Sequence, residues 1–306
     1  MRLDAELLSY LADTRQVTVR RDLPLSTLTT LRIGGAADLV LSPCDGGAML
    51  RLLDLLSLSD HPFRVLGAGS NLLASDGGYA GAIVLTRRLD RISVSGSTLR
   101  VGAGVSLSRA ANAAREAGLG GLEALYGIPG SIGGALAMNA GAFGCEISSL
   151  LSVATLYDPE TRRVFVAAPD ELGFAYRTSE ILASRLVLIS AILRLTPRDR
   201  EEIACRMRKT LEMRERSQPL GYPSAGCVFK KCPDGRSAGE LIEALGMKGK
   251  RRGDAMISER HANFIVNLGG ASATDVLSLA EEARRAVYDA YGVLLEYELE
   301  LLGDFL

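Results

Sequence analysis

The chain has 306 residues, enough for two or three compact domains whose hydrophobic cores need no disulfide or metal ion. Its 35 Lys and Arg residues nearly balance 36 Asp and Glu residues, so the net charge of -1 gives no electrostatic reason to expect a nucleic-acid or membrane partner. A small disulfide-bonded scaffold and a strongly basic binding protein are therefore excluded. The 33 glycines are a larger fraction of the residues than the usual share of about 7%. They indicate backbone that turns sharply or touches a ligand.

The N-terminal segment, residues 1–16, is a short acidic helical pattern without the basic and then apolar stretches of a signal peptide. The most apolar run, residues 186–193, is far shorter than the ~18 residues that span a bilayer. We therefore expect a cytoplasmic protein. The five cysteines lack paired CxxC spacing, and His61 and His261 are the two histidines, so we expect neither a disulfide framework nor a metal site.

Short strands and helices share the first two thirds of the chain. Helical patterns predict helices at 46–58 and 106–118. β-Prone runs closed by Gly, Pro or Asp predict strands at 37–41, 63–66, 82–86, 91–95, 99–102 and 186–194. A charged helix is predicted at 199–217, because one set of side chains recurs there at helical spacing: Ile203, Met207, Thr210, Leu211 and Arg214. Pro219 and Pro223 end it, which places a domain boundary near 197–220.

The last third predicts a strand at 227–231, a helix at 237–245 that ends at Gly246, and a long helix announced by the capping-box pattern Ser272-x-x-Asp275. The apolar stripe of the long helix is Val276, Leu279, Ala280, Ala283 and Val287. We therefore predict an α+β protein with two regions. The first is 1–197, with subdomains at about 1–60 and 61–197, and the second is 198–306, whose last strand at about 293–301 can return to the N-terminal region.

A glycine turn follows the predicted strand at 63–66. In the segment 67–71 (GAGSN), the missing side chains let consecutive backbone N–H groups approach a phosphate. The dinucleotide fingerprint needs a third glycine where Leu72 stands, and no crossover helix follows directly. Taken alone, the segment is better explained as an ordinary tight turn.

The segment 127–144 (GIPGSIGGALAMNAGAFG) is more specific, since it places six glycines, Ser131 and Asn139 within eighteen residues. It can neither hold a simple helix nor pack as a normal strand. Its exposed backbone donors suit a diphosphate and a flat aromatic ring. We therefore predict cofactor binding, against the alternative of a glycine-rich structural turn.

Together with other motifs, these segments resemble the UDP-N-acetylenolpyruvoylglucosamine reductase family from about residue 20 to the end of the chain. The other motifs are 29–35 (TTLRIGG), 174–179 (FAYRTS), 224–230 (SAGCVFK), 258–267 (SERHANFIVN) and 295–299 (LEYEL). The resemblance implies the FAD-binding fold of p-cresol methylhydroxylase and vanillyl-alcohol oxidase, followed by a C-terminal α+β substrate-binding domain. The length suggests the shorter form of the family, which lacks an extra loop over the substrate.

The resemblance also implies the reaction, a step in peptidoglycan precursor synthesis. NADPH reduces noncovalently bound FAD, and hydride then passes from flavin N5 to the enolpyruvyl ether of UDP-N-acetylglucosamine, giving UDP-N-acetylmuramate. No protein partner is expected. The residues expected to bind FAD are Arg32, Gly67, Ala68, Gly69, Ser70, Asn71, Gly127, Pro129, Gly130, Ser131, Gly133, Gly134, Asn139, Ala140 and Gly141. Tyr176 and Lys230 are expected to bind the substrate.

Two charged residues match catalytic positions of the family. Arg177 can bind the enolpyruvyl carboxylate and stabilise the charge that develops beside it, whereas a lone arginine is ordinarily a surface side chain. Glu298 is the second glutamate of the family's Leu-Glu-Pro-Glu pattern, in which Tyr297 here replaces proline. The period of two would also fit a solvated strand face, with Glu296 and Glu300 beside it.

Cys227 occupies the position where many relatives have a proton-donating serine. A thiol can perform this step, because a free thiol with a pKa of ~8.5 is mostly protonated at neutral pH. The alternative is a small buried apolar residue. The neighbouring Lys231 replaces an asparagine that helps to hold substrate in relatives, so that contact is absent or changed.

Other polar residues receive structural interpretations. The basic run 248–252 is predicted to be a solvated loop rather than a diphosphate site, and His261 is predicted to be structural because a buried strand follows it. Cys44, Cys145 and Cys205 receive no role. Two other functions stay open: an FAD-dependent oxidase of the same fold acting on a small alcohol or sugar, and a flavin-binding module without turnover.

Overall fold

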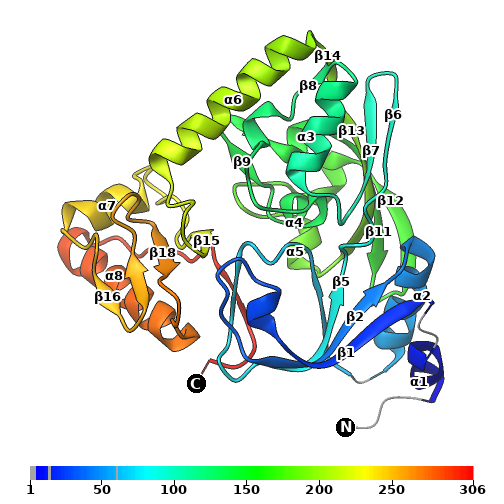
Figure 1. Ribbon diagram of the computed structural model, residues 1–306, viewed down its shortest axis with the longest axis horizontal. Coiled ribbons are helices and arrows are strands. Elements are labelled where there is room, and N and C mark those ends of the chain that lie inside the picture. The colour runs from blue at the N-terminus through cyan, green and yellow to red at the C-terminus, as the bar shows by residue number, and fades with distance from the viewer. Residues whose placement is uncertain (1–4, 13–14, 60, 306) are drawn as a thin grey trace. The chain divides into compact units, whose positions relative to one another are not determined.

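The computed structural model describes residues 5–12, 15–59 and 61–305 (Figure 1). Its internal contacts divide the chain into two units. The first unit is Met1–Arg21, Leu39–Ala68 and Gly81–Glu212, and the second is Asp22–Asp38, Gly69–Ala80 and Met213–Leu306. This division differs from the contiguous regions 1–197 and 198–306 that the sequence suggested. Two N-terminal segments join the C-terminal one. β4 (Leu72–Ala74) pairs in parallel with β19 (Glu300–Leu302), and the Leu31 carbonyl accepts a hydrogen bond from the Asn267 side chain at 3.1 Å.

Most residues of a four-stranded sheet with the strand order β1-β2-β5-β3 belong to the first unit, while the ends of β1, β2 and β5 belong to the second. Its strands are β1 (Val17–Pro24), β2 (Ala36–Pro43), β5 (Tyr79–Leu85) and β3 (Phe63–Leu66). Helix α2 (Gly46–Leu58) begins where the Asp45 carboxylate accepts the Ala48 N–H, and α1 (Ala5–Ala12) packs against it. The predicted helix at 46–58 and strand at 63–66 are confirmed.

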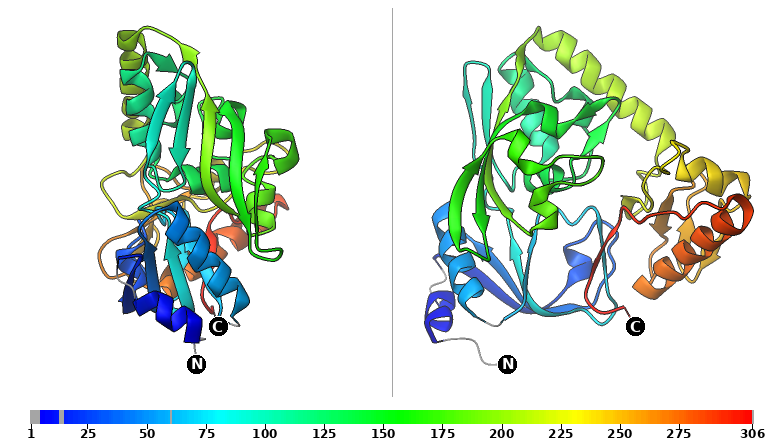
Figure 2. Two further views of the ribbon diagram at one scale, coloured as in Figure 1. Left: turned by 90° about the vertical axis from the view of Figure 1, so that its right-hand side faces the viewer. Right: turned by 180° about the vertical axis from the view of Figure 1, so that it is seen from behind.

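A five-stranded antiparallel sheet forms the rest of the first unit, in the order β12-β11-β13-β7-β6 (Figure 2). Its strands are β12 (Arg163–Ala167), β11 (Leu151–Asp158), β13 (Val187–Arg194), β7 (Thr98–Gly102) and β6 (Ile92–Ser95). Helix α4 (Ile132–Ala137) packs against β13 and β7, and α3 (Leu107–Glu116) packs against β6. The glycine-rich segment 127–144 is therefore carried on this sheet.

Short elements connect these strands. They are η1 (Leu25–Thr27), β8 (Leu119–Gly120), η2 (Glu123–Leu125), β9 (Gly141–Ala142), β10 (Cys145–Glu146), η3 (Ile147–Leu150), η4 (Pro169–Leu172), α5 (Glu180–Ala183) and β14 (Thr196–Pro197). Helix α6 (Arg200–Ser217) buries Ile203, Met207, Thr210 and Arg214 as its pattern predicts, while Leu211 is only half-buried.

The C-terminal part of the second unit holds a sheet in the order β15-β18-β17-β16. The strands are β15 (Ser224–Cys227), β16 (Arg251–Arg252), β17 (Ala255–Ile257) and β18 (Phe264–Asn267). Helices α7 (Ala238–Ala244) and α8 (Ala273–Tyr291) pack on each other, and α8 covers β16 and β17. The capping box at Ser272 and the buried apolar stripe of α8 are confirmed.

Two strand predictions near the C-terminus are wrong in their bounds. The strand predicted at 227–231 is β15, which ends at Cys227, and the strand predicted at 293–301 is reduced to β19, Glu300–Leu302. The reason is irregular pairing. Residues 228–230 bond to the Asn263 side chain and to the backbone of Glu296 and Glu298, instead of continuing a ladder. Part of the acidic pattern at residues 1–16 lies outside the described residues.

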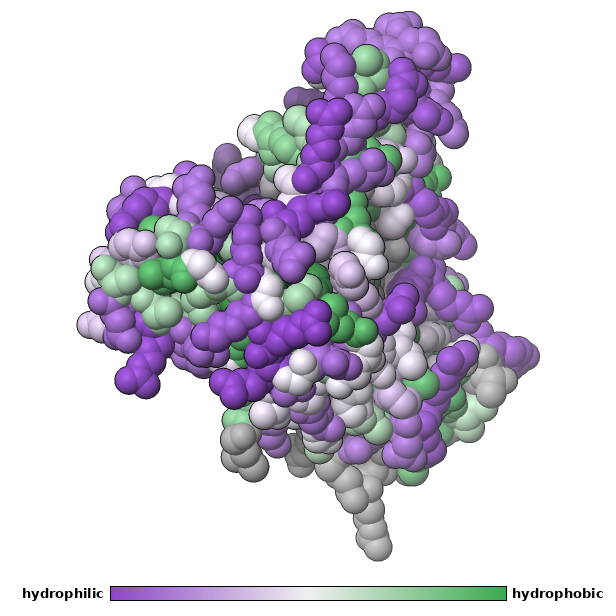
Figure 3. Space-filling view, turned by 60° about the vertical axis from the view of Figure 1, so that its left-hand side comes forward, coloured by the Kyte–Doolittle hydropathy of each residue, from purple (hydrophilic) through white to green (hydrophobic). Residues whose placement is uncertain are grey.

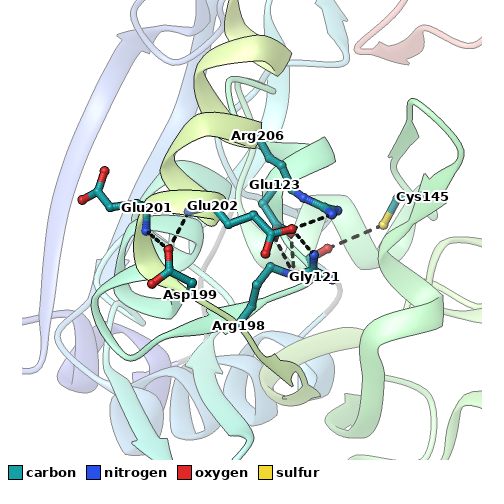
Figure 4. A network of polar contacts seen from close by, with 8 residues as sticks. All are labelled: Gly121, Glu123, Cys145, Arg198, Asp199, Glu201, Glu202 and Arg206. Atoms are coloured by element: carbon teal, nitrogen blue, oxygen red, sulfur yellow. Dashed lines mark hydrogen bonds and ion pairs between the residues drawn. The ribbon is translucent and has the colours of Figure 1, made fainter.

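A charged network joins the start of α6 to the loop that leads into the glycine-rich segment (Figure 4). The Glu123 carboxylate accepts the Gly121 N–H at 2.6 Å and lies 3.9 Å from the Arg198 Nε. Arg198 and Arg206 both donate to Glu202, at 2.7 and 2.8 Å. Because Glu123 is buried, these contacts hold the loop firmly just before residue 127.

The face drawn in Figure 3 is mostly hydrophilic, and its hydrophobic residues form small separate areas. Within the described residues, no helix is long and apolar enough to cross a membrane. Among the same residues, no group of three or more His, Cys, Asp or Glu side chains is placed to hold a metal ion.

Candidate active site

The structure brings Gly67 of one glycine segment next to Ser131 of the other, and both residues lie in the first unit. Gly67 follows β3, and a Cβ added to it would collide with the Ser131 hydroxyl, which caps α4 by accepting the Gly134 N–H at 3.3 Å. The Ser131 side chain is buried and committed to this cap. The sequence alone could not show that 67 and 131 are neighbours, because sixty-odd residues separate them.

Within the glycine-rich segment, Gly134 is a glycine that packing does not explain. It lies in the first turn of α4 and is exposed, and a Cβ added to it would meet nothing closer than the Ser131 hydroxyl at 3.6 Å. Gly133 differs, since its Cβ would press on Ala103 at 3.2 Å. Glycine in a helix costs about 1 kcal/mol relative to alanine. Because this exposed glycine lies within the segment predicted to bind the cofactor, its backbone is open to a ligand from solvent.

In the second unit, Gly69 and Asn71 serve the fold directly. Gly69 has a φ of +66° and its Cβ would collide with the Leu28 carbonyl, so only glycine fits there. The Asn71 side-chain amide donates to the Glu298 carbonyl at 2.8 Å, and the Asn71 carbonyl accepts the Glu300 N–H at 3.0 Å. Asn71 therefore holds the chain on both sides of Leu299.

Asn139 organises the turn that carries Arg177. The Asn139 side chain is buried, and its amide donates to the Ala175 carbonyl at 3.0 Å and to the Glu146 carboxylate at 3.0 Å. Ala175 and Thr178 exchange backbone hydrogen bonds, which leaves Tyr176 and Arg177 at the corner of a tight turn. The Asn139 side chain thus supports the site from behind, and its neighbours Ala140 and Gly141 are half-buried.

Arg177 is held in a strained backbone conformation. Its φ is +55°, in the left-handed region that non-glycine residues rarely adopt. One guanidinium nitrogen donates to the Gly141 carbonyl at 3.1 Å, and the guanidinium carbon lies 5.0 Å from the centre of the Tyr176 ring. The structure therefore places the Arg177 guanidinium beside the Gly141 carbonyl and the Tyr176 ring in the first unit.

Cys227 and Glu298 come close through paired backbone in the second unit. The Glu298 N–H donates to the Val228 carbonyl at 2.9 Å, and the Lys230 N–H donates to the Glu296 carbonyl at 2.8 Å. Cys227 and Glu298 are half-buried, whereas Glu296 and Glu300 are exposed. Of the three glutamates in this segment, Glu298 is thus the one withdrawn from solvent.

Asn263 is a supporting residue that the sequence analysis did not single out. Its side chain accepts the Phe229 N–H at 2.9 Å and donates to the Phe229 carbonyl at 2.8 Å, so it clamps the segment next to Cys227. The signal was the motif SERHANFIVN, which contains Asn263, although nothing in the motif says which side chain is turned toward residue 229.

The lysines near this segment differ in their surroundings. Lys230 is half-buried, with its ammonium 3.9 Å from the Glu296 carboxylate, and Lys231 is exposed. The basic run 248–252 makes ion pairs within the second unit: Lys248 with Glu243, and Lys250 and Arg252 with Glu282. These pairs support the prediction that the run is not a diphosphate site.

His261 has the environment of a structural histidine. Its Nδ1 accepts the Asn263 N–H at 3.2 Å, and its ring packs edge-on against Phe264. Burial, and then the nearby Lys248, lower the pKa of His261. The other histidine, His61, is buried in the first unit.

The lowered pKa predicts a loss of stability in acid. Below the ordinary histidine pKa of ~6.5, His261 is protonated in the unfolded chain but stays neutral in the folded chain, where its pKa is lower. The free energy of unfolding should therefore fall as the pH drops through that range, and His261→Gln should reduce this dependence. Urea unfolding of wild type and variant at about pH 5 and pH 7.5 measures it. An equal pH dependence in both proteins would contradict the prediction.

The remaining residues expected at the cofactor lie as follows. Arg32 is exposed with a φ of +58° in the second unit, where Ser70 is half-buried. In the first unit Pro129 is exposed, and Ala68, Gly127 and Gly130 are half-buried. The backbone around these residues is thus accessible to a ligand, while the buried side chains of Ser131 and Asn139 hold the backbone in place by hydrogen bonds.

Comparison with known proteins identifies the family. An FAD binding domain model matches residues 37–160, and the model of the UDP-N-acetylenolpyruvoylglucosamine reductase C-terminal domain matches residues 218–302. A UDP-N-acetylenolpyruvoylglucosamine reductase of Symbiobacterium thermophilum is 44% identical over 286 residues, which are 93% of this chain and 92% of the relative. The chain belongs to the UDP-N-acetylenolpyruvoylglucosamine reductase family.

Other members of the reductase family agree over the whole length. The enzyme of Geobacter metallireducens is 40% identical over 304 residues, which are 99% of this chain and 100% of the relative. The crystal structure of the reductase from Thermus caldophilus has a TM-score of 0.81 at 39% identity and covers 94% of this chain and 100% of that one. The predicted family, the FAD-binding fold with its C-terminal domain, and FAD as cofactor are confirmed.

Proposed function

We propose that this chain catalyses the NADPH-dependent reduction of the enolpyruvyl ether of UDP-N-acetylglucosamine to UDP-N-acetylmuramate. Membership of the reductase family supports the reaction, and one feature of the structure supports the cofactor's place. That feature is Gly134, an exposed helical glycine within the glycine-rich segment, with open space where a side chain would stand. We place the reaction in the cytoplasm, where a UDP-sugar and NADPH are made.

The residues present fit FAD. Backbone at residues 67–68 and 127–141, which lie in the first unit, would hold the diphosphate and ring, because it offers N–H groups with almost no side-chain bulk. FAD, when bound and reduced by NADPH, would supply the hydride that reaches the terminal carbon of the enolpyruvyl group. The protein must then manage the negative charge that develops at the adjacent carbon and deliver a proton to it.

Arg177 is proposed to bind the carboxylate of the enolpyruvyl group. A guanidinium presents parallel N–H donors that match a carboxylate, and here the turn 175–178 and the Gly141 carbonyl fix it in advance. As charge spreads onto the carboxylate during reduction, the same hydrogen bonds strengthen. The strain at the Arg177 backbone is consistent with a residue held for function.

Cys227 is proposed to donate the proton, and Glu298 to act beside it on the same half-reaction. The half-burial of both residues and their attachment through the 228–298 pairing support these roles. A thiol suits the task because it is protonated at neutral pH and gives up its proton more readily than an alcohol. Tyr176 and Lys230 are proposed to bind the UDP part of the substrate.

Gly134→Val tests the cofactor site. A Cβ at this position has room within the protein, so the variant should fold. Purified protein should nevertheless lose most of its flavin, because the new methyl groups are expected to occupy the ligand's space. Gly47→Val is the matched control, since Gly47 is also an exposed glycine in the first turn of a helix. The ratio of flavin to protein absorbance and far-ultraviolet circular dichroism measure the two effects.

Equal flavin content in both variants would contradict the placement of FAD at Gly134. A simpler experiment separates the other functions. NADPH should bleach the yellow colour of the purified protein, whereas a small-alcohol oxidase has no use for NADPH and a module without turnover would not be reduced.

A further inference from the structure

Tyr297 stands where the family pattern has proline, between Glu296 and Glu298. Its ring packs against the Phe229 ring with centroids 5.2 Å apart and planes tilted by 30°. Phe229 is only 2% exposed and both of its backbone groups are bound by Asn263. One face of Tyr297 therefore rests on a rigid part of the 224–230 motif.

The hydroxyl of Tyr297 is anchored to α8. It donates to the Glu281 carboxylate at 2.7 Å, and Arg284 pairs with the same carboxylate at 3.3 Å. Arg284 also donates from its Nε to the Leu295 carbonyl at 3.0 Å and lies 5.8 Å from the centre of the Tyr297 ring. Burial and the hydrogen bond to Glu281 raise the pKa of Tyr297, so the hydroxyl stays a donor at neutral pH.

These anchors act on the backbone that carries Glu298. Tyr297 and Phe229 form an isolated antiparallel bridge, flanked by the Lys230 to Glu296 and Glu298 to Val228 hydrogen bonds. The donors in this pairing are the N–H groups of residues 230 and 298, so a proline at 297 would remove no donor from it. Proline restricts the backbone through its ring, and tyrosine here restricts it through its side chain.

We propose that Tyr297 is a positioning residue for Glu298, which fixes the 296–298 segment against the Cys227 motif through Phe229 and the Glu281–Arg284 pair. The inference rests on the proposed role of Glu298 in the substrate half-reaction. Tyr297 itself need not touch the substrate. It replaces the stiffness of the family's proline with a hydrogen bond and a stacked ring.

Stopped-flow measurement of the two half-reactions tests the proposal on the flavin-loaded protein. Tyr297→Phe keeps the ring and removes the hydroxyl, so flavin reduction by NADPH should be unchanged while reoxidation by the enolpyruvyl substrate slows about tenfold, the worth of a hydrogen bond to a charged group. Glu281→Ala should have a similar effect. The double variant should be no slower than the slower single one, because both break the same link. Tyr297→Pro should recover most of the rate.

Tyr10→Phe is the control, since Tyr10 donates to the Ala48 carbonyl at 3.0 Å within the first unit and its loss should alter neither half-reaction. Wild-type reoxidation in Tyr297→Phe, additive losses in the double variant, or equal slowing of both half-reactions would each overturn the proposal. Glu298→Gln separates the two levels of inference. If Glu298→Gln slows reoxidation and Tyr297→Phe does not, only the positioning role of Tyr297 is overturned. If Glu298→Gln does not slow reoxidation, the proposed function of Glu298 is overturned.

Discussion

Arg177→Lys and Glu298→Gln should each slow reoxidation of the flavin by the enolpyruvyl substrate by ~10²- to 10³-fold, the usual effect of removing one preorganised electrostatic group. Reduction of the flavin by NADPH should proceed at nearly the wild-type rate. The reason is that the charge these residues manage develops on the substrate as it receives the hydride, and reduction of the flavin by NADPH does not involve the substrate. Lysine at 177 keeps the charge but loses the planar fork of donors, and glutamine at 298 keeps the shape but loses the charge.

Matched controls come from the same surroundings. Arg185 also has a positive φ, of +52°, and is exposed in the first unit, so Arg185→Lys should leave both half-reactions unchanged. Glu300→Gln is the control for Glu298, because Glu300 is exposed two residues further along. Stopped-flow traces that show equal slowing of reduction and reoxidation in Arg177→Lys or Glu298→Gln would point to a general defect and reject the assigned roles.

Cys227→Ala should show the second large effect. If the thiol donates the proton, this variant should take up hydride from NADPH normally and then stall at reoxidation, with a loss of ~10²-fold or more, the range typical of a missing general acid. Cys227→Ser should recover much of the rate, because serine fills this position in relatives. Cys205→Ala provides the control, since Cys205 is also half-buried but lies on α6. Wild-type turnover of Cys227→Ala would show that Cys227 only packs.

The pH dependence of reoxidation distinguishes a thiol donor from a hydroxyl donor. A free thiol ionises near pH ~8.5 and a thiolate cannot donate a proton, so the wild-type rate should fall on the alkaline side. In Cys227→Ser this fall should move to higher pH, because the hydroxyl keeps its proton. Rates measured from about pH 6 to pH 10 test this, and identical alkaline limbs in both proteins would exclude Cys227 as the donor.

Local patterns predicted most of the regular elements. The sequence predicted helix α2, helix α8 with its capping box, and the short strand β3, because periodicity and capping depend on residues near in sequence. The errors fall where pairing is irregular. Nothing local indicates that β15 ends at Cys227, because the chain beyond it is held by a side chain, Asn263, from another motif.

For the candidate site, too, the sequence predicted some features and not others. The motifs fixed which residues to examine, namely Arg177, Cys227 and Glu298, and the comparisons confirmed the family to which those motifs belong. The geometry of their support was not predictable. Asn139 behind the Arg177 turn is an example, since its hydrogen bond to Ala175 joins residues 36 positions apart.

The sequence by itself determined the α+β class, the family and the glycine segments, because composition, periodicity and motif spacing are properties of neighbouring residues. Only the tertiary structure decided which of the glycines in these segments the fold requires. Gly69 is required by a left-handed backbone and a close carbonyl, whereas Gly134 is exposed with space beside it. The physical reason is that steric need and hydrogen-bond partners are set by atoms far away in the chain, and their positions exist only once the chain has folded.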